Sequence, residues 1–219
     1  MTCSAIVFDL DGTLIDSNPV KRRGFDHIFA AHKKGADIVE LVLEKHRKAF
    51  RTVVIRAVLE QLHAAGELGC EPTDELVAEF AERYNRFCIE GAVACEEIPG
   101  ATQALKGLTM THQLFINTAT ATQAAEEIID RREWSQYFRG VLGFPPSKIE
   151  NLQTVAQQVG VRNHEIVMVG DDDHDAEAAN AFGCPFIAVQ RTCSHFTHPP
   201  SVFVKRLEEM FLLKIVSAS

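Results

Sequence analysis

Four short, nearly uninterrupted runs of apolar residues constrain this chain more than any other feature. They lie at residues 5–8, 114–116, 166–169 and 186–189, and helical pattern or turn residues separate each run from the next. Apolar runs of this length are typical of strands that are covered on both faces, as in a parallel sheet. The alternation of such runs with helices predicts a doubly wound, mainly parallel α/β sheet of the Rossmann-like kind.

Three helices are expected between residues 99 and 160. We expect one to open at Pro99, one to run from residues 122–123 through Trp134, and one to span about residues 150–159, closed by Gly160.

Residues 18–96 have a different character, with amphipathic helical patterns and few strand-like runs. Gly66, Gly69 and Pro72 divide this stretch into hairpin-like pieces. About 80 helical residues between the first two strands exceed an ordinary connection. We therefore predict a helical cap domain at 18–96, inserted into an α/β core domain made of 1–17 and 97–219.

Composition narrows the class of protein. The chain has 219 residues, a net charge of -8 and an isoelectric point near 5.6, so nucleic acid is not an expected partner. Six cysteines without a C-x-x-C pair favour reduced thiols over a zinc site or a disulfide framework. No apolar run approaches the roughly 20 residues of a membrane span. We expect a cytoplasmic protein without a membrane partner, either a monomer or a homodimer.

The first candidate for chemistry is the acidic pair that follows the first apolar run. Asp9 and Asp11 lie two residues apart just past the expected strand end, and Gly12 permits a tight turn there. Ligands of open α/β sheets bind beyond the carboxyl ends of the strands. A calcium-type loop or a plain turn is the alternative for such a D-x-D-G-T segment taken alone.

A second acidic group follows the third apolar run and favours a metal. Four aspartates occupy five positions between Asp171 and Asp175, and a bound cation would neutralise their mutual repulsion. Carboxylate oxygens suit Mg²⁺, so Asp171 is a candidate ligand. Asp172 and Asp173 are better explained as caps of the next helix.

Two further elements complete a candidate phosphate site. Thr118 and Ala119 follow the second apolar run and supply a hydroxyl and backbone N–H donors for phosphoryl oxygens. Lys148 is the only lysine between Lys106 and Lys205, and it lies 23 residues before Asp171. A lone lysine is usually a surface residue. Lys148 is a candidate for the site only because of its order along the chain relative to the other elements.

These elements follow one another along the chain as D-x-D-G-T, a strand followed by Thr118, then Lys148, then G-D-x-x-x-D. With this order the sequence resembles the haloacid dehalogenase (HAD) superfamily, in its phosphoglycolate phosphatase and β-phosphoglucomutase-like branch. The resemblance rests on residues 8–17, on 169–176 and on the Ile98-Pro99-Gly100 return to the core, and it covers nearly the whole chain. Two positions depart from the common family pattern. Ile149 follows Lys148 where many relatives have proline, and Asp172 stands where many have serine.

The resemblance implies a Mg²⁺-dependent phosphatase that acts on a small phosphorylated metabolite. Asp9 would attack phosphorus to form an aspartyl phosphate, and Asp11 would serve as general acid and then as general base. Thr118 and Lys148 would hold the phosphoryl oxygens. Mg²⁺ would be bound by Asp9, the Asp11 backbone carbonyl and Asp171, with Asp175 in the second shell or in contact with Lys148.

Two alternatives stay open. A phosphomutase of the β-phosphoglucomutase type would use the same four motifs and pass the phosphoryl group to a sugar hydroxyl instead of water. A non-catalytic phospho-acceptor or binding module would use the acidic pocket without turnover, although it has no evident need for the proton donor Asp11. Dehalogenation is disfavoured, because displacing a halide does not require that acid/base group.

Overall fold

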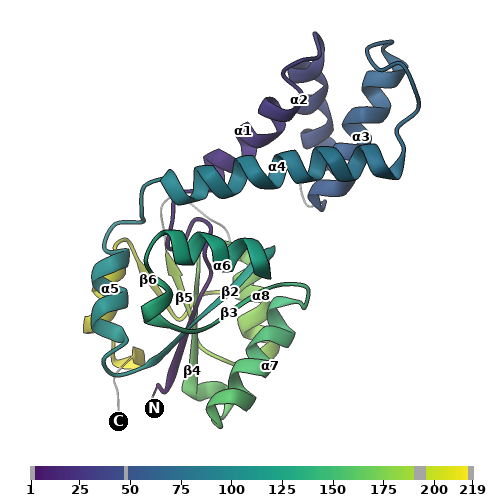
Figure 1. Ribbon diagram of the computed structural model, residues 1–219. Coiled ribbons are helices and arrows are strands. Elements are labelled where there is room, and N and C mark those ends of the chain that lie inside the picture. The colour runs from purple at the N-terminus through teal and green to yellow at the C-terminus, as the bar shows by residue number, and fades with distance from the viewer. Residues whose placement is uncertain (1–2, 47–48, 190–195, 217–219) are drawn as a thin grey trace. The chain divides into compact units, whose positions relative to one another are not determined.

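The computed structural model describes residues 3–46, 49–189 and 196–216. The chain forms two compact units, Met1–Ser17 with Val93–Ser219, and Asn18–Ala92 (Figure 1). The second unit is therefore a helical insertion into the first. Its role as a cap, with the bounds 18–96, stays a prediction. Within the described ranges, no helix has both the length and the hydropathy needed to cross a membrane.

A six-stranded sheet with the order β3-β2-β1-β4-β5-β6 forms the centre of the first unit, and every neighbouring pair is parallel. The predicted doubly wound parallel α/β fold is confirmed. The strands are β1 (Ala5–Phe8), β2 (Gln113–Ala121), β3 (Phe138–Phe144), β4 (Ile166–Gly170), β5 (Phe186–Val189) and β6 (Val202–Val204).

Helices cover both faces of this sheet. Side chains of α7 and α8, such as Leu152 and Ala179, pack in one buried cluster with Val7 and Met168 of the sheet. The alternate strand residues point to the other face, and α6 packs against β2 and β3. The helices of this unit are α5 (Ala101–Leu108), α6 (Thr122–Arg131), α7 (Lys148–Val159) and α8 (Asp173–Phe182), with short 3₁₀ turns η1 (Ser135–Tyr137), η2 (Asn163–Glu165), η3 (Leu207–Leu212) and η4 (Lys214–Val216).

The second unit has a hydrophobic core of its own, built by four helices. Phe29, Ile55 and Leu59 are fully buried in it. Phe29 stacks on Phe80 with ring centroids 5.0 Å apart, and the Tyr84 hydroxyl donates to the Lys21 carbonyl at 3.1 Å. The helices are α1 (Asn18–Ile28), α2 (Gly35–Lys45), α3 (Arg51–Ala64) and α4 (Asp74–Ala94), the last of which continues beyond Ala92 into the first unit.

Two strands and two helix ends differ from the sequence prediction. The edge strands β3 and β6 were not predicted and are only partly buried: Arg139 and two glycines interrupt the apolar residues of β3, and β6 is an apolar run of only three residues. The second predicted helix, α6, ends at Arg131 and not at Trp134, because Glu133 adopts a positive φ of 59°. Helix α7 begins at Lys148, about two residues before its predicted start, because Ser147 caps it.

Candidate active site

The two predicted acidic segments meet at the carboxyl edge of the sheet. Phe8 of β1 lies in register with Val169 of the neighbouring strand β4. The Asp9 N–H donates to the Val169 carbonyl at 2.9 Å, so Asp9 continues the pairing past the assigned strand. Asp171 follows Gly170, the last residue of β4. Strand register therefore brings these two carboxylates to adjacent positions.

Asp175 reaches the same place from the first turn of α8. Asp172 is the N-cap of that helix and forms a capping box with Asp175, as the sequence predicted for a capping residue. The Asp175 side chain has no exposed surface. It lies against Gly170, where a Cβ atom would come within 2.3 Å of the Asp175 carboxyl carbon. The lack of a side chain at Gly170 makes room for the carboxylate.

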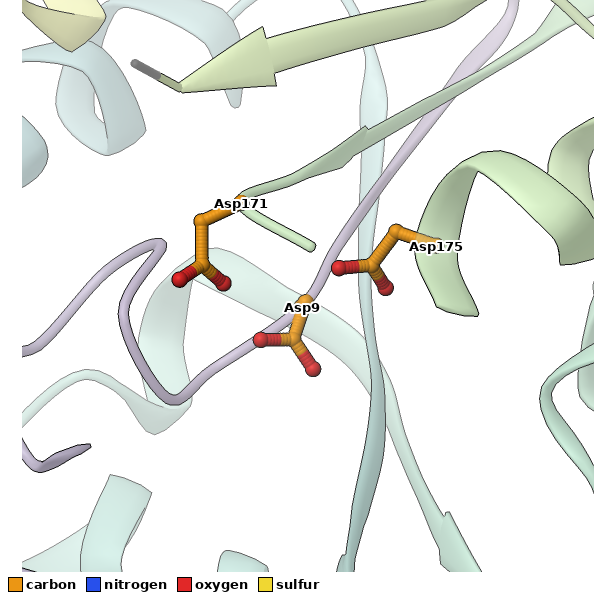
Figure 2. Close-up of side chains that lie close together, drawn as sticks. All are labelled: Asp9, Asp171 and Asp175. Carbon is orange, nitrogen blue, oxygen red and sulfur yellow. The ribbon is translucent and has the colours of Figure 1, made fainter. Parts of the chain in front are cut away.

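Asp9, Asp171 and Asp175 form one carboxylate cluster. One oxygen from each lies within 4.8 Å of the others. Figure 2 shows the three side chains converging from the ends of β1 and β4 and from α8. Burial, together with the neighbouring Asp9 and Asp172 carboxylates, raises the pKa of Asp171 to about 7. Clustered oxygen ligands whose negative charges repel each other are suited to a hard divalent cation, so the residues present fit a metal ion.

Lys148 supplies a positive charge beside this cluster. Its Nζ atom lies 2.7 Å from Asp9 Oδ1 and 2.5 Å from Asp175 Oδ1. Burial alone would lower the pKa of Lys148, but the Asp175 and Asp9 carboxylates offset it and hold the pKa above its ordinary value. The lysine is therefore a fixed cation that joins the end of β1 to α8.

Asp11 turns toward a set of hydroxyl groups. The chain folds back after Asp9 through a turn in which Gly12 has a positive φ of 87°. The Asp11 carboxylate, which is 8% exposed, accepts hydrogen bonds from Ser17 at 2.5 Å, Thr120 at 2.8 Å and Thr118 at 3.4 Å. These donors orient a carboxylate that lies near Asp9 in sequence but has different partners.

The end of β2 brings the remaining predicted residues to this edge. Thr118 is buried, and its hydroxyl accepts from the Thr120 N–H at 3.1 Å while it contacts Asp11. Ala119 is exposed. Thr118 is thus joined to Asp11, whereas Lys148 is joined to Asp9 and Asp175.

Three hydroxyl residues of the site were not assigned a role from the sequence. Ser17 and Thr120 contact Asp11, and Thr13 donates to Asp171 Oδ1 at 3.2 Å. Thr120 follows Thr118 by two positions, and such residues share a face of a strand. That spacing is the signal by which Thr120 could be found. Thr13 and Ser17 both lie in residues 8–17, the segment on which the family resemblance rests, and that motif is the signal by which they could be found.

Comparison with known proteins agrees with this geometry. A family model described as haloacid dehalogenase-like hydrolase matches residues 3–183. The chain therefore belongs to the haloacid dehalogenase-like hydrolase family. Within it, the chain lies in the phosphoglycolate phosphatase-like branch, among the phosphoric monoester hydrolases.

One relative and two solved structures illustrate this placement. Phosphoglycolate phosphatase 1 of Pseudomonas aeruginosa is 27% identical over 196 residues, covering 87% of this chain and 70% of the relative. A predicted phosphoglycolate phosphatase from Haemophilus somnus has a TM-score of 0.75 at 17% identity, covering 97% of this chain and 98% of its own. The HAD-hydrolase YfnB from Bacillus subtilis, solved bound to magnesium, has a TM-score of 0.72 at 15% identity with the same coverage.

Proposed function

We propose that this chain is a Mg²⁺-dependent phosphomonoester hydrolase that acts on a small phosphorylated metabolite through an aspartyl phosphate on Asp9. One observation supports this proposal most directly. The Lys148 ammonium group lies within 2.7 Å of a carboxylate oxygen of both Asp9 and Asp175 at the sheet edge. Asp171 lies in the same carboxylate cluster. A nucleophilic carboxylate, a fixed cation and an acidic metal cluster are the groups that phosphoryl transfer requires.

In the first half-reaction, an Asp9 carboxylate oxygen forms a bond to phosphorus as the bond between phosphorus and the ester oxygen breaks. Asp11 gives its proton to the departing alkoxide, which leaves as an alcohol. Lys148, Thr118 and the Ala119 backbone N–H hold the phosphoryl oxygens and offset their charge.

In the second half-reaction, Asp11 takes a proton from water, and the water oxygen attacks phosphorus. The bond from phosphorus to the Asp9 oxygen breaks, which releases inorganic phosphate and restores the Asp9 carboxylate. One carboxyl group therefore works in both directions, and the hydroxyls of Ser17 and Thr120 keep it oriented.

The carboxylates of Asp9 and Asp171, with the Asp11 backbone carbonyl, would hold Mg²⁺, which when bound offsets the repulsion between the anionic nucleophile and the phosphate. Asp175 is a member of the same cluster. Its contact with Lys148 supports a role in placing that lysine.

A phosphate-release screen tests the proposal. The purified enzyme with Mg²⁺ is incubated with a panel of small phosphomonoesters, in which the relatives' names make 2-phosphoglycolate the first choice. We expect hydrolysis of at least one ester, and we expect Asp9→Asn to abolish it, because an amide is a poor nucleophile of nearly the same shape.

Each outcome of the screen decides between functions. Transfer of phosphate to a second sugar hydroxyl, with no free phosphate, would favour the phosphomutase. A long-lived phosphoenzyme without turnover would favour the phospho-acceptor module. Substantial activity of a correctly folded Asp9→Asn variant would remove Asp9 as the nucleophile, and circular dichroism of the variant provides the folding control.

A further inference from the structure

Two buried asparagines lie behind the candidate active site and have no part in the chemistry described above. Asn117, on β2, has no exposed surface, and Asn151, on α7, is 1% exposed. The Asn151 Nδ2 donates to the Asn117 Oδ1 at 3.0 Å. The two side chains form one amide pair between the sheet and the helix.

The amide NH₂ groups of this pair also donate hydrogen bonds to backbone carbonyls near the site. Asn117 Nδ2 donates to the backbone carbonyl of Lys148 at 2.9 Å. Asn151 Nδ2 makes a second, longer contact to the Gly143 carbonyl of β3 at 3.4 Å. A backbone carbonyl has two lone pairs, so the Lys148 carbonyl can accept from Asn117 in addition to its helical partner. The pair thereby joins β2, β3 and the first turn of α7.

The position of the pair in the chain relates it to two candidate phosphate-binding residues. Asn117 directly precedes Thr118, and Asn151 lies three residues, nearly one helical turn, after Lys148. The lysine stem is flexible, so the place of its ammonium group depends on its backbone and on the two carboxylates that it contacts. The amide pair fixes the position of the Lys148 backbone, through the hydrogen bond to its carbonyl.

Packing alone does not account for asparagines at these two positions. A buried amide must be desolvated and is tolerated only when it is hydrogen-bonded. Two leucines would fill nearly the same space without any polar group to satisfy. The polar pair is explained if its directional bonds to the Lys148 carbonyl are what the site requires.

We propose that Asn117 and Asn151 are positioning residues, which hold the first turn of α7 at the distance from Thr118 at which Lys148 serves the phosphoryl group. This inference rests on the proposed function and extends it from the residues that touch substrate to a pair that acts through Lys148.

The test separates stability from activity. We compare Asn117→Leu, Asn151→Leu and the double variant by denaturant unfolding and by kcat/KM for p-nitrophenyl phosphate. Each single variant leaves a buried amide or carbonyl unpaired and should lose both stability and activity. The double variant removes both amides, so it should recover much of the stability. Its kcat/KM should stay roughly 10- to 100-fold below wild type, because a displacement near 1 Å at a reacting centre can cost about 100-fold.

A second measurement applies if the double variant does not recover stability. Asn117→Leu is added to Lys148→Met, and the residual kcat/KM is compared. If the pair acts through Lys148, the added substitution causes little further loss. An equal fold loss with and without Lys148 would overturn the proposal, as would joint recovery of stability and activity in the double variant.

Asn163 provides a control outside the site. It is an exposed residue just before β4, and its Nδ2 donates to the Phe182 carbonyl at 2.6 Å. Asn163→Leu should lower stability without changing kcat/KM more than about twofold, which is the level expected of a change remote from the reacting groups.

If wild type hydrolyses no ester, the proposed function fails. If wild type is active and Asn117→Leu is equally active, only the positioning role fails.

Discussion

Asp11 is distinguished from the other site carboxylates by its partners. Ser17, Thr118 and Thr120 all donate hydroxyl groups to it, whereas Asp9 and Asp175 contact the Lys148 cation. Different environments permit two neighbouring carboxylates to have different chemical roles. The arrangement supports Asp9 as the nucleophile and Asp11 as the group that transfers protons.

This division predicts a particular defect for Asp11→Asn. General acid–base catalysis contributes about 10²- to 10⁴-fold, so the loss of turnover should be severe for an alkyl phosphate. The loss in forming the aspartyl phosphate should be smaller for p-nitrophenyl phosphate, because a phenolate departs with little protonation. Single-turnover measurements of this step over esters of falling leaving-group pKa would reveal the trend.

A defect of equal size for every leaving group would contradict the acid/base role. Asp11 would then organise the site without transferring a proton. Thr120→Val is a useful companion variant, because it removes the 2.8 Å donor to Asp11 and keeps the carboxylate. It should reduce turnover less than Asp11→Asn does.

Among secondary-structure elements, α7 has the most direct connection to the site, because Lys148 is its first residue. Ser147 accepts from the Glu150 N–H, and the Glu150 side chain accepts from the Ser147 N–H, which completes a capping box. At the other end, Gly160 adopts a positive φ of 74° as the C-cap. The two ends of the helix therefore provide a matched pair of substitutions.

We predict that Ser147→Ala and Gly160→Ala lower the free energy of unfolding by similar amounts and differ in activity. The loss of an N-cap costs about 1 kcal/mol, and alanine at a positive φ costs about 1–2 kcal/mol. Ser147→Ala should also lower kcat/KM, because the first turn that carries Lys148 frays. Gly160→Ala should leave kcat/KM near wild type, since nothing lies within 4 Å of the added Cβ.

Chemical denaturation and steady-state kinetics on the two variants would check this. If both variants lose the same stability and neither loses activity, the cap does not contribute to the placement of Lys148. If Gly160→Ala loses more activity than Ser147→Ala, the argument from the first turn is wrong.

Element by element, the central sheet was more predictable than its edges. The strands β1, β4 and β5 are covered on both faces and are read directly from their apolar runs. The edge strand β3 contains Gly140 and Gly143, and Gly143 is needed because a Cβ there would lie 2.4 Å from the Thr120 carbonyl. Gly143 is required by this close approach of β3 to the end of β2, and such an approach leaves no periodic pattern in the sequence.

At the scale of the whole molecule, a cation at the carboxylate cluster links activity to stability. Asp9, Asp171 and Asp175 are buried or half-buried together. A ligand that binds only the folded state stabilises it, by about 2.7 kcal/mol at 100 times the dissociation constant. Mg²⁺ should therefore raise the unfolding temperature of the intact chain, and Asp171→Asn should reduce that rise.

The same ion should control turnover. Activity should vanish in EDTA and return with Mg²⁺ but not with Ca²⁺, whose looser coordination would let Asp9 chelate the ion instead of attacking phosphorus. Full activity in EDTA after extensive dialysis would remove the metal from the mechanism. A Mg²⁺-induced rise in unfolding temperature that survives Asp171→Asn would place the ion elsewhere.

The sequence by itself determined the four central strands of the sheet, the helical insertion after Ser17, and the placing of Asp9 and Asp171 at one sheet edge. These features depend on local patterns, since an apolar run identifies a buried strand and a carboxylate after it lies at the strand end. Only the tertiary structure decided which other residues reach those carboxylates. Lys148 is 139 residues from Asp9, and Thr120 is 109 residues from Asp11. The order of the motifs predicted Lys148 as a site residue, but its direct contact with Asp9 and that of Thr120 with Asp11 follow from how α7 and β2 pack on the sheet.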